Sequence, residues 1–199
     1  MLEKLVLTQT YIEIGKLPLI NNDVLKKHCL YYEKHITRER GFDKTDALSE
    51  DTDIPEHEEA NKVFSLILEE LKNKDNKKYS IREYWAHIHE KNHSTNLHHH
   101  AVVHDLKNAP IFSGVYYIAA PKDCGVIVFQ YPINQYEEKR YWIKPESGLF
   151  LLFPSTLLHY VTRNESEEKR ISISFNIEIK WIEIVMIVLN VVKVGLKEM

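Results

Sequence analysis

Histidine is the residue type in this chain whose number and spacing point to chemistry. Seven of the 11 histidines lie between residues 87 and 104. Within that stretch, a strand over residues 96–103 would place His98 and His100 on one face and His99 on the other. Two neighbouring imidazoles and a third, distant ligand would form a facial site for Fe, Zn, Cu or Ni. Exposed or hydrogen-bonded histidines on a sheet are the alternative.

A distant third ligand and an anion-binding residue follow later in the chain. His159 lies in an apolar strand-like run, where a single histidine can also be a core residue. After it, Arg170 and Ser172 alternate with Ile171 and Ile173, so a strand would turn both polar residues to one face. The planar guanidinium group suits a carboxylate that accepts two hydrogen bonds.

These residues lie in a part of the chain that is typical of β-sheet proteins. Short β-branched or aromatic runs alternate with turn residues, and the prolines lie between the runs. They predict strands over residues 79–90, 96–103, 112–119, 126–131, 149–153, 157–161 and 170–179. Lys139, Arg140 and Trp142 fall in the connection 132–147, which is expected to be a loop or a solvated hairpin.

The N-terminal part has helical patterns. Residues 7–15 alternate like a strand, and residues 21–23 have side chains that cap a following helix. Residues 41–54 form a loop, and Pro55 with the acidic residues after it marks a second helix start. We expect residues 1–78 to pack on the sheet formed by residues 79–199, within a single, mainly β domain.

The order of these segments resembles the 2-oxoglutarate and Fe(II)-dependent dioxygenases, and especially their small bacterial and phage members. The resemblance is carried by His98-x-His100, the segment SGVYY at 113–117, residues 148–154, His159 and the segment RISISFN at 170–176. It covers roughly residues 79–179. It implies a double-stranded β-helix, the jelly roll of cupins, with Fe(II) as cofactor and 2-oxoglutarate and O2 as cosubstrates.

The resemblance also implies which residues bind 2-oxoglutarate. Arg170 matches the residue that binds its far carboxylate, and Ser172 matches the hydroxyl that assists. Tyr116 or Tyr117 would lie beside the cosubstrate, and strand alternation allows only one of them to face the site.

For the metal, the resemblance implies His98 as the first ligand and His159 as the distal one. In the family a carboxylate follows two residues after the first histidine, but this chain has His100 there. His100 is the expected second ligand. Asp105, with a shifted strand register, stays an alternative.

Composition excludes several other classes of protein. The net charge of −3 disfavours a general nucleic-acid surface, and two cysteines exclude a disulfide scaffold and favour the cytoplasm. The first residues lack a secretory signal. The apolar run 184–192 is too short to span a membrane, so we expect a buried element or a homodimer contact.

The expected reaction is hydroxylation of a protein or small-molecule substrate, with 2-oxoglutarate converted to succinate and CO2. By family analogy, a peptidyl residue such as proline is the first candidate. Two other functions stay open: a three-histidine, cupin-like metalloenzyme that uses no 2-oxoacid, and a non-catalytic jelly-roll binding module.

Overall fold

The structure is a computed structural model that describes residues 10–35, 50–52, 54–75, 77–101, 109–134 and 136–180. Its helices are α1 (Asn22–His35) and α2 (Glu58–Asp75). Its strands are β1 (Glu13–Lys16), β2 (Glu50–Thr52), β3 (Tyr79–His89), β4 (Thr95–His98), β5 (Phe112–Ala119), β6 (Ile127–Asn134), β7 (Glu137–Ile143), β8 (Leu149–Pro154), β9 (Leu158–Val161) and β10 (Arg170–Ile179).

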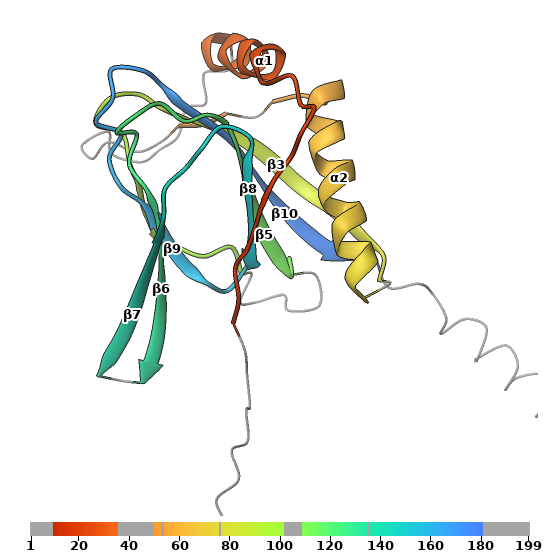
Figure 1. Ribbon diagram of the computed structural model, residues 1–199, viewed down its shortest axis with the longest axis vertical. Coiled ribbons are helices and arrows are strands. Elements are labelled where there is room, and N and C mark those ends of the chain that lie inside the picture. The colour runs from red at the N-terminus through yellow and green to blue at the C-terminus, as the bar shows by residue number, and fades with distance from the viewer. Residues whose placement is uncertain are drawn as a thin grey trace, which may run out of the picture.

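The strands form two antiparallel sheets. The larger has the order β1-β8-β5-β10-β3-β2, and the smaller has the order β4-β9-β6-β7. From β3 to β10 the chain crosses repeatedly between the sheets, and one apolar core contains residues of both, such as Tyr117 and Phe129. This is the expected double-stranded β-helix, and the prediction of a mainly β fold with N-terminal helices is confirmed (Figure 1).

Helices α1 and α2 cover the outer face of the larger sheet (Figure 1). Strand β10 alternates Ile171 and Ile173, in the core under the helices, with Arg170 and Ser172, which line a cavity between the sheets. All four side chains are buried. Because buried polar groups need partners, this alternation builds a polar site into the jelly roll.

Several expected boundaries are wrong. The strand expected over 96–103 ends at His98, and residues 102–108 lie outside the described residues. The connection 132–147, expected to be a loop or a solvated hairpin, contains strand β7, which forms an exposed hairpin with β6; its residues are exposed up to Trp142, which removes the usual alternation of apolar and polar residues. The short strand β2 pairs with β3 inside the expected loop 41–54.

The apolar run 184–192 lies outside the described residues. Among the helices that the structure describes, none has the length and apolar character needed to cross a membrane.

Buried Asn164 connects two loops, the one between β3 and β4 and the one between β9 and β10. The side-chain amide of Asn164 donates to the carbonyls of His89 and Glu168, both at 2.9 Å. Its backbone amide donates to the carbonyl of His93, and its carbonyl accepts from Asn92. These bonds join the β3–β4 loop, which leads to His98, to the β9–β10 loop, which leads to Arg170.

Replacement of Asn164 by alanine tests this connection. Because Asn164→Ala leaves the buried carbonyl of His89 and the half-buried carbonyl of Glu168 without their donor, we expect the free energy of unfolding to fall by about 2 kcal/mol. Urea denaturation measures the change, with Asn61→Ala on the exposed side of α2 as control. Equal stability of the two variants would contradict this role for Asn164.

Candidate metal centre

The pairing of β4 with β9 brings two distant histidines together. His98 and His159 are directly opposed Cα partners in the two strands, so their side chains lie on the same face. Their ring centroids are 4.3 Å apart. His159 is 4% exposed, whereas His98 is half-buried, so the pair lies where the sheet core meets the surface.

His100 also lies beside this pair, but a different interaction from the expected strand pairing positions it. It lies beyond the end of β4, so strand alternation does not orient it. Instead its backbone amide donates to the carbonyl of Ser155 at 2.8 Å, in the turn before β9. The imidazoles of His98 and His100 still lie close, with centroids 5.0 Å apart.

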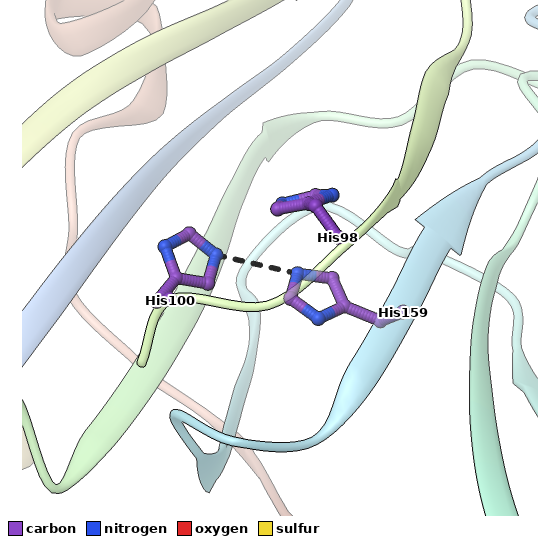
Figure 2. A group of neighbouring side chains, drawn as sticks. All are labelled: His98, His100 and His159. Atoms are coloured by element: carbon purple, nitrogen blue, oxygen red, sulfur yellow. Dashed lines mark hydrogen bonds between the residues drawn. The ribbon is translucent and has the colours of Figure 1, made fainter. Parts of the chain in front are cut away.

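The three imidazoles form a group that could hold a metal ion (Figure 2). One nitrogen from each of His98, His100 and His159 lies within 4.8 Å of the others, and the Nε2 atoms of His100 and His159 are 3.4 Å apart. Neighbouring ligands about 2.1 Å from a metal are separated by roughly 3 Å, so little movement is needed. Imidazole suits Fe, Zn, Cu and Ni.

Backbone carbonyls orient two of the rings. The Nδ1 atom of His98 lies 2.7 Å from the carbonyl of Asn96, and that of His159 lies 2.9 Å from the carbonyl of Leu157. A carbonyl only accepts, so Nδ1 carries the proton in each ring and Nε2 presents its lone pair. Such carbonyls commonly orient the histidine ligands of metals.

Burial keeps His159 unprotonated. Desolvation, together with the neighbouring rings of His98 and His100, lowers the pKa of His159 to about 3. Because only a neutral imidazole can donate its lone pair to a metal, His159 is ready to bind one at neutral pH.

Arg170 lines the same cavity as the three histidines. Its side chain is 1% exposed, and Nη1 donates to the backbone carbonyl of Cys124 at 2.6 Å. Within the described part of the chain, Nη2 is buried without a hydrogen-bond partner. Burial lowers the pKa of Arg170, but a guanidinium group stays charged in proteins. A buried cation with an unused donor calls for an anion.

The turn that presents the Cys124 carbonyl depends on left-handed backbone. Asp123 and Gly125 have φ angles of 62° and 79°. A Cβ atom on Gly125 would lie 2.5 Å from the carbonyl oxygen of Arg163 and 2.6 Å from that of Thr162. Residue 125 therefore has to be glycine for the turn to keep this shape. Sequence patterns missed this function because a backbone carbonyl leaves no signal in residue type; Gly125 was the available hint.

The other residues expected at the cosubstrate divide between two faces. Tyr117 and Ser172 line the cavity, and burial raises the pKa of Tyr117 above its ordinary value. Tyr116, the alternative to Tyr117, points the other way: it packs under the helices and its hydroxyl donates to Asn22 at 2.8 Å. Tyr116 is therefore not part of the cavity, because neighbouring strand residues face opposite sides.

One face of β3 completes the cavity wall. His87 and His89 line it, and the indole N–H of Trp85 donates to Nε2 of His87 at 2.8 Å. The Trp85 ring also lies near His100, with centroids 5.6 Å apart. Burial lowers the pKa of His89, whose Nε2 lies 2.9 Å from the Thr95 hydroxyl. Trp85, His87 and His89 alternate with Ala86 and Ile88 in the sequence, and this spacing is the sequence signal for the wall.

Among the described residues that line the cavity, none is acidic. The alternative ligand Asp105 lies outside the described residues. A larger hollow of about 860 Å³ lies between α2 and β3, but its lining contains no histidine or cysteine. The histidine-lined cavity is therefore the place where this structure offers both metal ligands and an anion-binding group.

The part of the chain that forms this cavity matches a known protein family. Residues 83–176 match the sequence model of the family described as "Putative 2OG-Fe(II) oxygenase". The matched segment runs from β3 to β10 and includes all three histidines of the triad as well as Arg170. No protein of curated function matches the chain in sequence.

Solved structures of oxygenases share this fold. The viral collagen prolyl hydroxylase of Paramecium Bursaria Chlorella virus-1, in complex with 2OG, has a TM-score of 0.62 and 22% identity, covering 84% of this chain and 95% of that one. A Pseudomonas putida prolyl-4-hydroxylase has a TM-score of 0.62 and 13% identity, covering 85% and 93%. For an oxidoreductase of the 2OG-Fe(II) oxygenase family from Burkholderia pseudomallei these values are 0.51 and 15%, and the match covers 67% of this chain and 62% of that chain.

The family match and the ordered motifs fall on the same strands, and the jelly roll has the architecture of these oxygenases. Over residues 83–176 the chain matches the 2OG-Fe(II) oxygenases, dioxygenases that use Fe(II), 2-oxoglutarate and O2.

Proposed function

We propose that His98, His100 and His159 hold Fe(II) and that Arg170 binds the far carboxylate of 2-oxoglutarate. The observation that carries this proposal is that one cavity combines three converging imidazoles with a buried guanidinium N–H that has no partner among the described residues. These groups fit a divalent metal and a dicarboxylate, since neutral nitrogen ligands leave the metal charge to bind one carboxylate and Arg170 binds the other.

When bound, Fe(II) with 2-oxoglutarate and O2 supplies the oxidant that hydroxylates a C–H bond, and 2-oxoglutarate leaves as succinate and CO2. The chain supplies binding and orientation. The Cys124 carbonyl holds one arm of Arg170, so the other arm is directed at the ligand. Ser172 and Tyr117 add hydroxyl groups beside it, and Trp85 fixes the ring of His87 near the metal ligands.

The proposed substrate is a peptidyl residue, with proline as the first candidate. Two of the structures that share the fold are prolyl hydroxylases, with matches that cover 84% and 85% of this chain. Identities of 22% and 13% support the fold alone, so the substrate rests on analogy.

A second candidate function follows from the ligand set. Fe(II) sites of this kind commonly have two histidines and one carboxylate, whereas all three groups here are imidazoles. A cupin-like metalloenzyme that uses no 2-oxoacid would fit the same triad. It would not require Arg170, so an Arg170 variant separates the two functions.

Anaerobic titration with Fe(II) and then 2-oxoglutarate tests the proposal. We expect a visible charge-transfer band that requires both. His98→Ala or His159→Ala should weaken Fe(II) binding at least about a hundredfold, because two imidazoles hold the metal far less well than three. His99→Ala, on the exposed neighbour in the chain, is the matched control.

In the same titration, Arg170→Met should keep Fe(II) binding and weaken 2-oxoglutarate about a hundredfold, because a buried charge-assisted hydrogen bond is lost. Failure of the wild-type protein to bind Fe(II) would reject the proposed function. Activity that depends on metal but survives Arg170→Met would favour the enzyme without a 2-oxoacid.

Gly125→Ala tests how the turn positions Arg170. The added Cβ atom has to move the turn away from the carbonyls of Arg163 and Thr162, and the Cys124 carbonyl moves with it. We expect about tenfold weaker 2-oxoglutarate binding and unchanged Fe(II) binding, measured by titration calorimetry. Gly148→Ala is the control, because its φ of 86° costs similar strain but its Cβ meets nothing closer than 3.8 Å. An equal loss of 2-oxoglutarate affinity in both variants would contradict a role of this turn in positioning Arg170.

Burial of His159 also predicts how pH affects the metal-free protein. Its pKa is about 3 when folded and about 6.5 when unfolded, so only the unfolded chain takes up this proton between those values. The stabilisation that comes from keeping His159 neutral is fully present above pH 6.5, and it is lost as the pH falls toward 3. Between pH 7 and 5, the free energy of unfolding should fall by about 1–2 kcal/mol less in His159→Phe than in the wild-type protein, measured by urea denaturation with EDTA. Parallel pH profiles would contradict a neutral, buried His159.

A further inference from the structure

The face that carries two histidines of the triad continues across the smaller sheet. His98 lies opposite His159, His159 lies opposite Phe129, and Phe129 lies opposite Tyr141. Directly opposed residues of antiparallel strands share a face, so these four side chains form one row. Phe129 is buried with its ring centroid 5.9 Å from that of His159, whereas Tyr141 is 54% exposed. The row therefore runs from the candidate metal site to the surface of the β6–β7 hairpin.

The next row toward the hairpin tip carries a second aromatic ring and a cation. Tyr131 lies opposite Lys139, two residues from Phe129 and Tyr141 along their strands. Tyr131 packs at the margin of the core between the sheets, and so does Ile143, which confirms that alternate residues of both strands point to this side. Tyr131, Lys139 and Tyr141 are named here the hairpin face.

The charges on the two sides of β7 differ. On the other side, Arg140 is paired with Glu138, with Nε 2.8 Å from the carboxylate, and Glu138 also accepts from Gln130. For Lys139, no ion pair forms with any residue that the structure describes, and its side chain is exposed. The hairpin face thus combines two aromatic rings with a lysine that forms no ion pair with the described residues.

Strand geometry gives the size of a ligand that would use both sites. Two strand spacings separate His159 from Tyr141, about 10 Å, and two further residues, about 7 Å, lead to Lys139. The distance from the triad to Lys139 is thus about 12 Å, the length of three to four residues of extended chain. A free amino acid is too short to span it, but a polypeptide spans it readily.

We propose, on the basis of the proposed function, that the hairpin face binds the substrate polypeptide beside the residue that is oxidised. Tyr131 and Tyr141 pack against apolar side chains of the substrate. Lys139 selects an acidic side chain three or four residues from the target, because its charge has no partner in the described part of the chain.

Fluorescence anisotropy with Fe(II) and 2-oxoglutarate, without O2, tests the proposal. The probes are two labelled eleven-residue peptides with a central proline and either glutamates or lysines three and four residues to each side. The wild-type protein should bind the glutamate peptide about fivefold more tightly, and Lys139→Glu should reverse the preference. Tyr141→Ala should weaken both peptides about fivefold.

Two residues on the other side of the same strand provide matched controls. Arg140→Glu makes the same change of charge as Lys139→Glu, and Trp142→Ala removes an aromatic ring that is 69% exposed. Both should leave the peptide preference and affinity within twofold of wild type. The proposal would be overturned if the wild-type protein bound the two peptides equally well. It would also be overturned if the Arg140 and Trp142 variants changed peptide binding as much as the Lys139 and Tyr141 variants.

Succinate formation after O2 is admitted separates this inference from the proposed function. If the Lys139-dependent preference is present but no peptide stimulates succinate formation, the hairpin face binds acidic polypeptides and the proposed reaction is wrong. If the proline peptides are hydroxylated with no dependence on Lys139 or Tyr141, the proposed function holds and the inference about the hairpin face is wrong.

Discussion

Antiparallel pairing in the smaller sheet is the constraint on which the rest of the site depends. Because β4 and β9 pair with His98 opposite His159, two imidazoles from distant parts of the chain share one face. The turn before β9 accepts a hydrogen bond from the amide of His100 and so brings in the third. A shift of one residue in this pairing would turn either histidine to the opposite face. The core between the sheets stabilises the register, since Phe129 packs against His159 in the same row.

Electrostatics gives the site its selectivity for anions. The cavity contains imidazoles and one buried guanidinium group, and no acidic residue among those described. A bound divalent metal would make the cavity strongly positive, and the two negative charges of a dicarboxylate would offset that positive charge. Burial of Arg170 is unfavourable without such a ligand, which makes binding of the anion and stability of the site interdependent.

Much of this site was predictable from the sequence, and the reasons are physical. The polar alternation from Arg170 corresponds to strand geometry. The two-residue spacing of His98 and His100 also indicated neighbouring imidazoles, but His100 lies beyond β4 and is placed by its hydrogen bond to Ser155. Periodicity cannot decide between Tyr116 and Tyr117, because alternation gives opposite faces without saying which face the helices cover. The Cys124 carbonyl is a backbone group with no residue signature. Residue types did not decide between a loop and a hairpin at β7, because this strand is exposed on both sides, which leaves no apolar pattern.

The central claim is that three imidazoles, with no carboxylate, bind the iron. X-ray absorption spectroscopy of the anaerobic Fe(II) protein, with and without 2-oxoglutarate, measures the ligands directly. The structure predicts multiple-scattering features of three imidazoles from His98, His100 and His159, with two oxygens of 2-oxoglutarate added on its binding. A spectrum with two imidazoles and a protein carboxylate before 2-oxoglutarate is added would contradict the claim.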